Sequence, residues 1–264
     1  MTTAPAHPRP GAEDPRPRRA AAGGRRAGRW GPPRHGAGAM LLLPFTAGML
    51  PAWGGRPVWW HVPLLVAWLA AYLFSYFALL AVKTGRAARV RPQLLTYGAV
   101  VLATGLPVVV ARPAVLLVAP AFVALLAVNV VAARHRRDRA LGAGLASVVQ
   151  ACLVTPVVVL VADRPVPPVL GAATAVLLYL AGTVVHVKAM IRERRSSAYA
   201  RADVGYHLAA VVPAVVLSVW LAVPFSLFAL RAALLTRRRT SVALVGAVEV
   251  GCSVLLVAAL ALPH

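Results

Sequence analysis

Charged residues are scarce in this chain of 264 residues: only 13% are Asp, Glu, Lys or Arg, whereas 60% are hydrophobic. A soluble globular domain carries roughly 25% charged residues. The composition therefore excludes an ordinary soluble domain and predicts a membrane protein.

Acidic residues are the scarcest charged group, with 7 Asp and Glu against 28 Lys and Arg and a net charge of +21. In a soluble chain this excess would indicate nucleic-acid binding. Here the basic residues lie between long apolar runs, so we expect no nucleic-acid partner. Lys83 and Lys188 are the only lysines. In a chain so rich in arginine, a single arginine is weak evidence of function.

Cysteines and paired carboxylates are also lacking. Cys152 and Cys252 each lie in an apolar run, which predicts packing residues rather than a disulfide framework. A catalytic Mg²⁺ or Zn²⁺ needs two or three converging ligands. No paired-carboxylate motif occurs among the five acidic residues beyond residue 34, which are Asp138, Asp163, Glu193, Asp203 and Glu249. We therefore predict no metal and no cofactor.

The first 34 residues differ in composition from the rest of the chain. They are rich in proline and arginine and contain almost no large apolar side chains. Such a segment cannot bury enough apolar surface to offset the entropy lost on ordering. We predict a disordered cytoplasmic tail at 1–34, followed by a transmembrane domain at 35–264.

From residue 37 onward, apolar runs long enough to cross a hydrocarbon core of about 30 Å recur between basic connections. Backbone groups in lipid must be satisfied internally, and no lipid-exposed strand pattern occurs. The chain therefore predicts an all-α, polytopic transmembrane helical bundle. We predict about nine spans, at residues 37–52, 62–82, 93–111, 114–133, 141–162, 167–187, 204–219, 222–235 and 242–262.

The segment 204–235 decides between nine spans and eight. Lys and Arg alternate between rich and poor connections, which places the N-terminus and the even-numbered connections in the cytoplasm. A single span over 204–235 would put Arg237, Arg238 and Arg239 outside. Two short helices with a bend at Ala222–Pro224 keep these arginines inside, so we expect a bacterial plasma-membrane protein with nine spans. The eight-span arrangement is the alternative.

Two parts of the chain contain polar groups at or near membrane depth. In the first, H-V-K-A-M-I-R-E-R-R at 186–195, helical spacing puts Lys188 and Arg192 on one face and His186 and Glu193 on another. This basic helix end either holds an anion or snorkels to phospholipid. In the second, Glu249 lies alone in the last span. It forms either a structural ion pair, with candidate partners Arg231, His207 and Lys188, or a proton or ligand site.

The start of the first span, P-P-R-H-G-A-G-A-M at 32–40, is rich in glycine. Gly36 and Gly38 allow another helix to approach and free backbone N–H groups beside His35, as in helix N-termini that bind anions. The alternative is a packed helix start with a hydrated histidine.

Several motifs resemble those of the YwiC-like bacterial membrane proteins, a family without an assigned activity. They are P-R-H-G-A-G-A-M-L-L-L-P-F at 33–45, G-T-V-V-H-V-K-A-M-I-R-E-R at 182–194, G-Y-H-L at 205–208 and G-A-V-E-V around Glu249. The architecture is also loosely similar to the UbiA-type prenyltransferases, nine-helix bundles with active sites after the second and sixth helices. The matching connections here begin at Lys83 and Lys188 and lack the aspartate motifs for Mg²⁺ and diphosphate.

Together these features predict a membrane protein that binds or moves an anionic lipid or small metabolite through a cytoplasm-facing basic pocket. The candidate ligand-binding residues are His35, Lys83, His186, Lys188, Arg192 and Arg194, with Glu193 and Glu249 orienting them. No catalytic residue and no oligomeric state is predicted. The alternatives are a UbiA-like prenyltransferase-type enzyme without the metal motifs and a structural or assembly factor.

Overall fold

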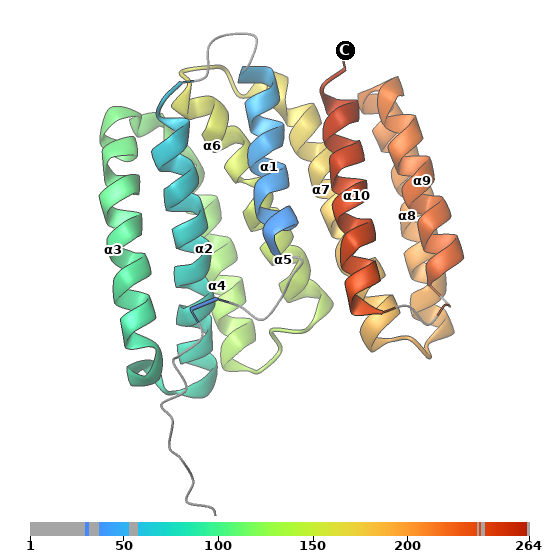
Figure 1. The fold of residues 1–264 in the computed structure, drawn as a ribbon, viewed down its shortest axis with the longest axis horizontal. Coiled ribbons are helices and arrows are strands. Elements are labelled where there is room, and N and C mark those ends of the chain that lie inside the picture. Colours follow the sequence, from blue (N-terminus) through green and yellow to red (C-terminus); the bar gives the residue numbers. More distant parts are fainter. Residues whose placement is uncertain (1–29, 32–36, 53–57, 237, 239–240, 263–264) are drawn as a thin grey trace, which may run out of the picture.

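The computed structural model describes residues 30–31, 37–52, 58–236, 238 and 241–262. Over these residues the fold is an all-α bundle without strands, as predicted (Figure 1). The predicted disordered tail lies outside the described residues except for Trp30 and Gly31. Trp30 packs edge-on against Tyr97, with ring centroids 6.3 Å apart.

The helices follow one another with short connections, and several are preceded or followed by a single 3-10 or π turn. In order they are α1 (Ala37–Ala52), α2 (His61–Thr84), α3 (Ala87–Ala111), η1 (Pro113–Val118), α4 (Ala119–Arg134), α5 (Leu141–Cys152), α6 (Val154–Val161), η2 (Pro167–Val169), α7 (Leu170–Val187), η3 (Lys188–Arg192), α8 (Ser197–Leu217), η4 (Val219–Leu221), α9 (Ala222–Leu235) and α10 (Val242–Leu260).

Seven helical segments in the described part of the chain are long and apolar enough to cross a membrane. Two shorter apolar helices, Met40–Leu50 and Val219–Leu235, accompany them. The predicted helical membrane bundle is therefore confirmed, and its nine apolar segments correspond to the nine predicted ones.

The segment 204–235 forms two helices, but not with the predicted boundaries. α8 begins at Ser197, where the Ser196 hydroxyl accepts a hydrogen bond from the Tyr199 N–H, and it contains Pro213. The chain turns at Ser218, whose backbone is extended, and not at Ala222–Pro224. Pro224 lies in the first turn of α9, where a missing N–H costs no intrahelical bond. α8 and α9 pack side by side, which excludes a single bent helix (Figure 1).

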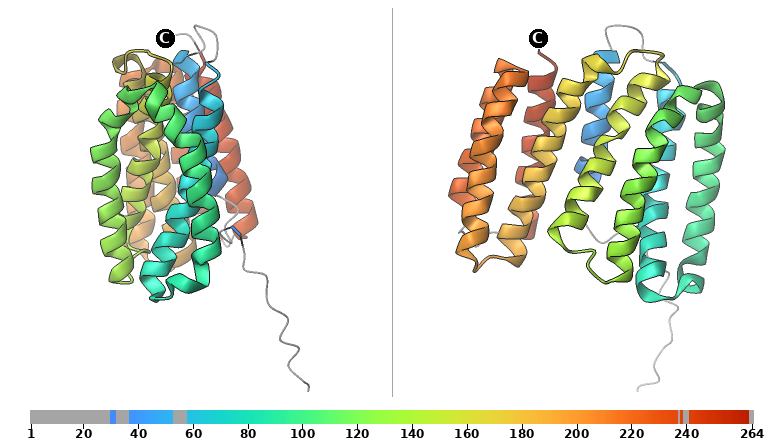
Figure 2. Two further views of the ribbon diagram at one scale, coloured as in Figure 1. Left: turned by 90° about the vertical axis from the view of Figure 1, so that its left-hand side faces the viewer. Right: turned by 180° about the vertical axis from the view of Figure 1, so that it is seen from behind.

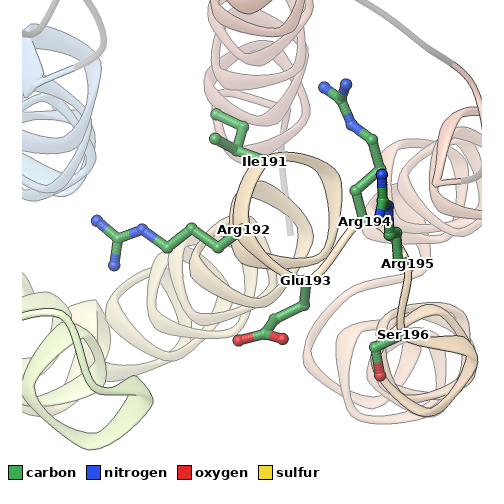
Figure 3. A pocket seen from close by; sticks show the side chains of 6 residues that line it. All are labelled: Ile191, Arg192, Glu193, Arg194, Arg195 and Ser196. Carbon is green, nitrogen blue, oxygen red and sulfur yellow. The ribbon is translucent and has the colours of Figure 1, made fainter.

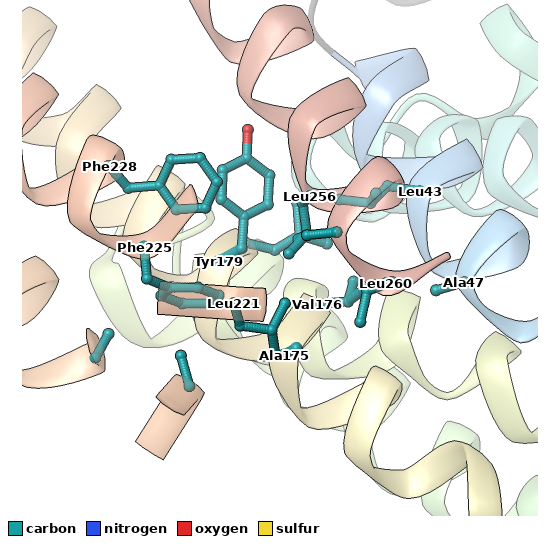
Figure 4. Close-up of a cluster of buried hydrophobic side chains, with 14 of the residues drawn as sticks. Leu43, Ala47, Ala175, Val176, Tyr179, Leu221, Phe225, Phe228, Leu256 and Leu260 are labelled. Carbon is teal, nitrogen blue, oxygen red and sulfur yellow. The ribbon is translucent and has the colours of Figure 1, made fainter. Parts of the chain in front are cut away.

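The helices form a bundle that is broad in one direction and narrow in the other. α1 and α10 lie in one layer, and α4, α5, α6 and α7 lie behind them (Figure 2). In the larger core cluster, Tyr179 of α7 packs beside Phe228 of α9 and Leu256 of α10 (Figure 4). This cluster joins α7, α9 and α10, the helices that hold most of the buried polar groups described below.

The two ends of the bundle differ strongly in charge. The connections after α2, α4, η3 and α9 lie at the lower end in Figure 1, and together with the adjoining helix ends they contain most of the basic residues that follow the tail. At the opposite end, the described basic residues are Arg112, which pairs with Asp163, and Arg164. We refer to the lower end as the basic end.

Candidate functional site

The most buried charged group of the bundle is Asp203 on α8, whose exposed fraction is 0%. Its Oδ2 lies 2.7 Å from Nδ1 of His186, the penultimate residue of α7. The same oxygen lies 2.6 Å from the hydroxyl of Thr236, at the end of α9. Three helices therefore meet at one carboxyl group.

His207 connects this carboxyl group to the next charged residue. Its Nδ1 lies 2.8 Å from the carbonyl oxygen of Asp203, one turn earlier, and 3.2 Å from Oδ1. Its Nε2 lies 3.1 Å from Nη2 of Arg231 on α9. Gly182 makes room for this ring, because a Cβ at position 182 would lie 2.9 Å from Nε2.

Arg231 forms a buried ion pair with Glu249 on α10, through Nη1 and Oε1. The other carboxylate oxygen accepts a hydrogen bond from the Thr183 hydroxyl at 2.8 Å and lies 3.1 Å from the hydroxyl of Tyr179. Ser253, one turn after Glu249, lies 3.2 Å from that phenol oxygen. The polar contacts therefore continue from Asp203 to the middle of α7.

We call this set of residues the buried network. Its members are His186, Asp203, His207, Arg231, Glu249, Tyr179, Thr183, Thr236 and Ser253, each at most 9% exposed as a whole residue. Ionisable groups inside a membrane are costly unless paired, and they commonly mark ion pathways and proton relays. The buried network is therefore the strongest candidate functional site of the bundle.

The buried network lies in the part of the bundle nearest the basic end. Asp203 is six residues beyond the start of α8, about 9 Å along a helix that rises about 1.5 Å per residue. Glu249 is seven residues beyond the start of α10, about 10 Å by the same measure. A group entering from the basic end would meet the buried network after about two helical turns.

Of the three partners predicted for Glu249, the structure selects Arg231. His207 lies one step further, on the other side of the guanidinium. Lys188 lies elsewhere: its Nζ is 5.1 Å from the centre of the Tyr199 ring. His186 and Glu249, both predicted as site residues, belong to the same network.

The predicted shared face of His186 and Glu193 is wrong, because residues 188–192 form a π turn. The Glu193 N–H donates to the carbonyl of Lys188 at 3.0 Å, five residues earlier. A π turn still keeps residues four apart, such as Lys188 and Arg192, near one face, but its extra residue rotates His186 away from the face of Glu193. His186 consequently points into the buried network, while Glu193 lies at the surface.

The end of α7 borders an open hollow of about 680 Å³, lined by Ile191, Arg192, Glu193, Arg194, Arg195 and Ser196. Figure 3 shows that these side chains spread outward in different directions around the turn. The Arg192 side chain donates from Nη1 to the carbonyl of Arg139 at 3.1 Å, and Nε of Arg194 donates to the carbonyl of Met190 at 2.9 Å.

Lys83 lies at the end of α2 and pairs with Asp138 in the connection between α4 and α5, at 2.8 Å. Partial burial alone would raise the pKa of Asp138, but the hydrogen bonds and charge of Lys83 outweigh it and the pKa lies below its usual value. Asp138 precedes Arg139, whose carbonyl holds Arg192. Lys83 is thus connected to the hollow through this connection, whereas the predicted site residue His35 lies outside the described residues.

Sequence reasoning did not place Asp203, Thr183, Tyr179 or Thr236 in the site. Asp203 was expected in a connection, because the helix was expected to begin at residue 204. The detectable signal is the i, i+4 pair of Asp203 and His207 followed by an apolar helix. The hydroxyl residues Thr183, Tyr179 and Thr236 have no comparable sequence pattern that would have placed them in the site. Among the described residues no group of His, Cys, Asp and Glu is arranged to hold a metal ion.

Fold and site together define a helical membrane bundle with a buried network of ionisable residues. The chain belongs to the YwiC-like family. The family model, described as YwiC-like protein, matches residues 32–159. An uncharacterized protein named YwiC from Bacillus subtilis is 31% identical over 187 residues, which cover 67% of this chain and 73% of that protein.

A second relative, an uncharacterized protein of Haemophilus influenzae, is 31% identical over 218 residues, or 82% of this chain and 90% of that protein. No solved structure matches the chain. The likeness to the UbiA-type prenyltransferases therefore has no support from these comparisons and stays a hypothesis.

Proposed function

We propose that this chain is a plasma-membrane protein whose basic end faces the cytoplasm and binds an anionic lipid or small metabolite there. The observation that carries the proposal is the open hollow at the end of α7. Three of its lining residues are arginines, Arg192, Arg194 and Arg195, against one acid, Glu193. Guanidinium groups bind phosphate and carboxylate through charge-assisted, often bidentate hydrogen bonds.

Two features favour a specific binding region over a snorkelling helix end. The end of α7 continues into the π turn η3, and such turns occur frequently at functional sites. The guanidinium of Arg192 donates from Nη1 to the carbonyl of Arg139, in a connection that the Lys83–Asp138 pair fixes to α2. Lys83 then acts as a positioning residue for the hollow.

The proposed orientation predicts the location of reporter fusions. Fusions after Arg91, Arg139 and Arg201 should report the cytoplasm, and a fusion after Arg164 should report the exterior, because the basic connections stay inside. The most informative fusion follows Arg239. An exterior signal there would contradict an arrangement in which α8 and α9 form a pair of antiparallel spans.

Replacing Arg192, Arg194 and Arg195 together with alanine should weaken binding of an anionic ligand at least about tenfold. A hydrogen bond to a charged group contributes about 1.5–3 kcal/mol, and about 1.4 kcal/mol is a factor of ten. The measurement is native mass spectrometry with phosphatidylglycerol, together with a thermal-shift titration with inorganic phosphate. If only the binding of phosphatidylglycerol is lost, the ligand is a lipid headgroup. If the thermal shift with inorganic phosphate is lost, the ligand is a free anion.

The matched control replaces Arg86, Arg89 and Arg91, which are exposed at the start of α3, with alanine. It removes the same charge from the same end of the bundle. We expect it to retain the ligand. If both triple variants lose the same amount of ligand binding, only the overall charge matters, and the proposal of a local binding pocket is wrong.

A further inference from the structure

The charges of the buried network do not balance when both of its histidines are neutral. If Asp203 and Glu249 are both ionised, they bring two negative charges, and Arg231 brings one permanent positive charge. Two negative charges and one positive charge leave a net charge of −1 between apolar helices. Because an isolated charge at this depth is costly, the balance requires one additional positive charge.

Among the residues that the structure describes, no other side chain near the network supplies that charge. The nearest lysine, Lys188, lies over the ring of Tyr199, and Arg194 donates to a backbone carbonyl. Arg201 and Arg238 are exposed. Arg192 donates to the carbonyl of Arg139, Arg195 is exposed, and Glu193 is an acid. The other described titratable groups on the helices packed around the network are neutral acids, namely Tyr179, Tyr199, Tyr206, Cys152 and Cys252.

The geometry leaves room for nothing larger than a proton. His186 Nδ1 and Asp203 Oδ2 are 2.7 Å apart, and Thr236 Oγ1 is 2.6 Å from the same oxygen. These are direct hydrogen-bonding distances. A metal ion or an organic cation cannot lie between atoms at such separations.

His207 is excluded as the carrier by its partner. A guanidinium has only donors, so Nε2 of His207, 3.1 Å from Nη2 of Arg231, must present a lone pair. The hydrogen of His207 is then on Nδ1, facing the carbonyl oxygen of Asp203. A second hydrogen on Nε2 would point at the N–H of Arg231 and break this contact.

We propose that the buried network is a membrane-embedded proton-binding site that holds one proton on the His186–Asp203 pair. The proton lies either on His186, as an imidazolium beside a carboxylate, or on Asp203. In passing between them the N–H bond breaks, its electron pair stays on nitrogen, and an O–H bond forms on Oδ2. Both forms are neutral overall.

Thr236 accommodates both forms. When Asp203 is a carboxylate, the hydroxyl of Thr236 donates to Oδ2. When Asp203 is a carboxylic acid, its O–H donates to the lone pair on Nδ1 of His186, and the hydrogen of Thr236 can turn to the carbonyl of Ala232.

Loss of this proton leaves one uncompensated negative charge where α7, α8 and α9 meet. Water, a cation or a separation of these helices must then offset it. The proposal thus adds a protonation step to the bundle and holds whether or not an anion binds at the hollow.

The test is nuclear magnetic resonance of the full chain in nanodiscs at neutral pH, labelled with ¹⁵N-histidine and ¹³C-aspartate. We expect His186 to carry hydrogen on both ring nitrogens, or Asp203 to be a carboxylic acid, with His207 protonated on Nδ1 alone. Exposed His135 serves as the reference in the same sample. A neutral His186 beside an ionised Asp203, or an imidazolium at His207, would overturn the proposal.

Asp203→Asn should leave His186 with one ring hydrogen at the same pH, because the network then balances without the proton. Asp163→Asn, at the opposite end of the bundle, should leave His186 unchanged. If Asp203→Asn does not fold, the wild-type spectrum decides alone. The titration with phosphate and the arginine variants play no part in this readout, so failure here is separate from failure of the proposed anion site.

Discussion

Glu249→Ala should destabilise the folded bundle by about 3–5 kcal/mol, the cost typical of removing one partner of a buried ion pair. The side chains of Arg231 and Glu249 are 5% and 11% exposed, so water does not replace the lost carboxylate. Thr183 would lose its acceptor in the same substitution. The measurement is equilibrium unfolding in mixed detergent micelles.

Two controls separate the unpaired charge from the loss of side-chain volume. Arg231→Met combined with Glu249→Leu removes both charges and should recover much of the stability, which a double-mutant cycle reveals as coupling. Asp163→Ala breaks a pair whose members are 28% and 62% exposed, and should cost no more than about 1 kcal/mol. If Glu249→Ala costs no more than Asp163→Ala, the buried network contributes little to the fold.

The sequence predicted the helices wherever an apolar run ends at a strong boundary. The expected span 62–82 corresponds to α2, which ends at Thr84 before Gly85, a residue with φ of +67°. A positive φ favours glycine and ends a helix, so this boundary is visible in the sequence. The expected span 141–162 likewise corresponds to α5 and α6 together.

Boundaries set by tertiary contacts were not predictable in the same way. α8 begins seven residues before the expected position because Asp203, expected in water, is compensated by His186 on another helix. The π turn at 188–192 is another case. No local residue pattern distinguishes it from an α-helical turn, and the shared face inferred for His186 and Glu193 was lost with it.

The candidate site was predicted in part for a similar reason. An acid alone in an apolar run is conspicuous, so Glu249 was recognised and Arg231 was among its candidate partners. Which helices face one another depends on packing, and spans that are apolar on all sides carry little directional pattern. The meeting of α7, α8, α9 and α10 around Asp203 and Glu249 therefore required the structure.

The close approach of α1 and α6 gives a prediction that depends only on packing. Gly48 of α1 faces α6 so closely that a Cβ there would lie 2.8 Å from the carbonyl oxygen of Thr155 and 2.9 Å from Cβ of Val158. The backbone oxygen cannot move aside as a flexible side chain would. The Thr155 hydroxyl donates to the carbonyl of Pro44 at 2.9 Å and fixes the two helices at this distance.

Gly48→Ala should therefore destabilise the bundle by about 1–3 kcal/mol, the usual cost of overpacking a core. Gly251→Ala is the matched control, because Gly251 is also inside a helix and a Cβ there meets nothing within 4 Å. An exposed helical glycine gains up to about 1 kcal/mol when replaced by alanine. The two substitutions should shift the unfolding midpoint in opposite directions, and a shift of the same sign in both would mean that α1 and α6 do not pack this closely.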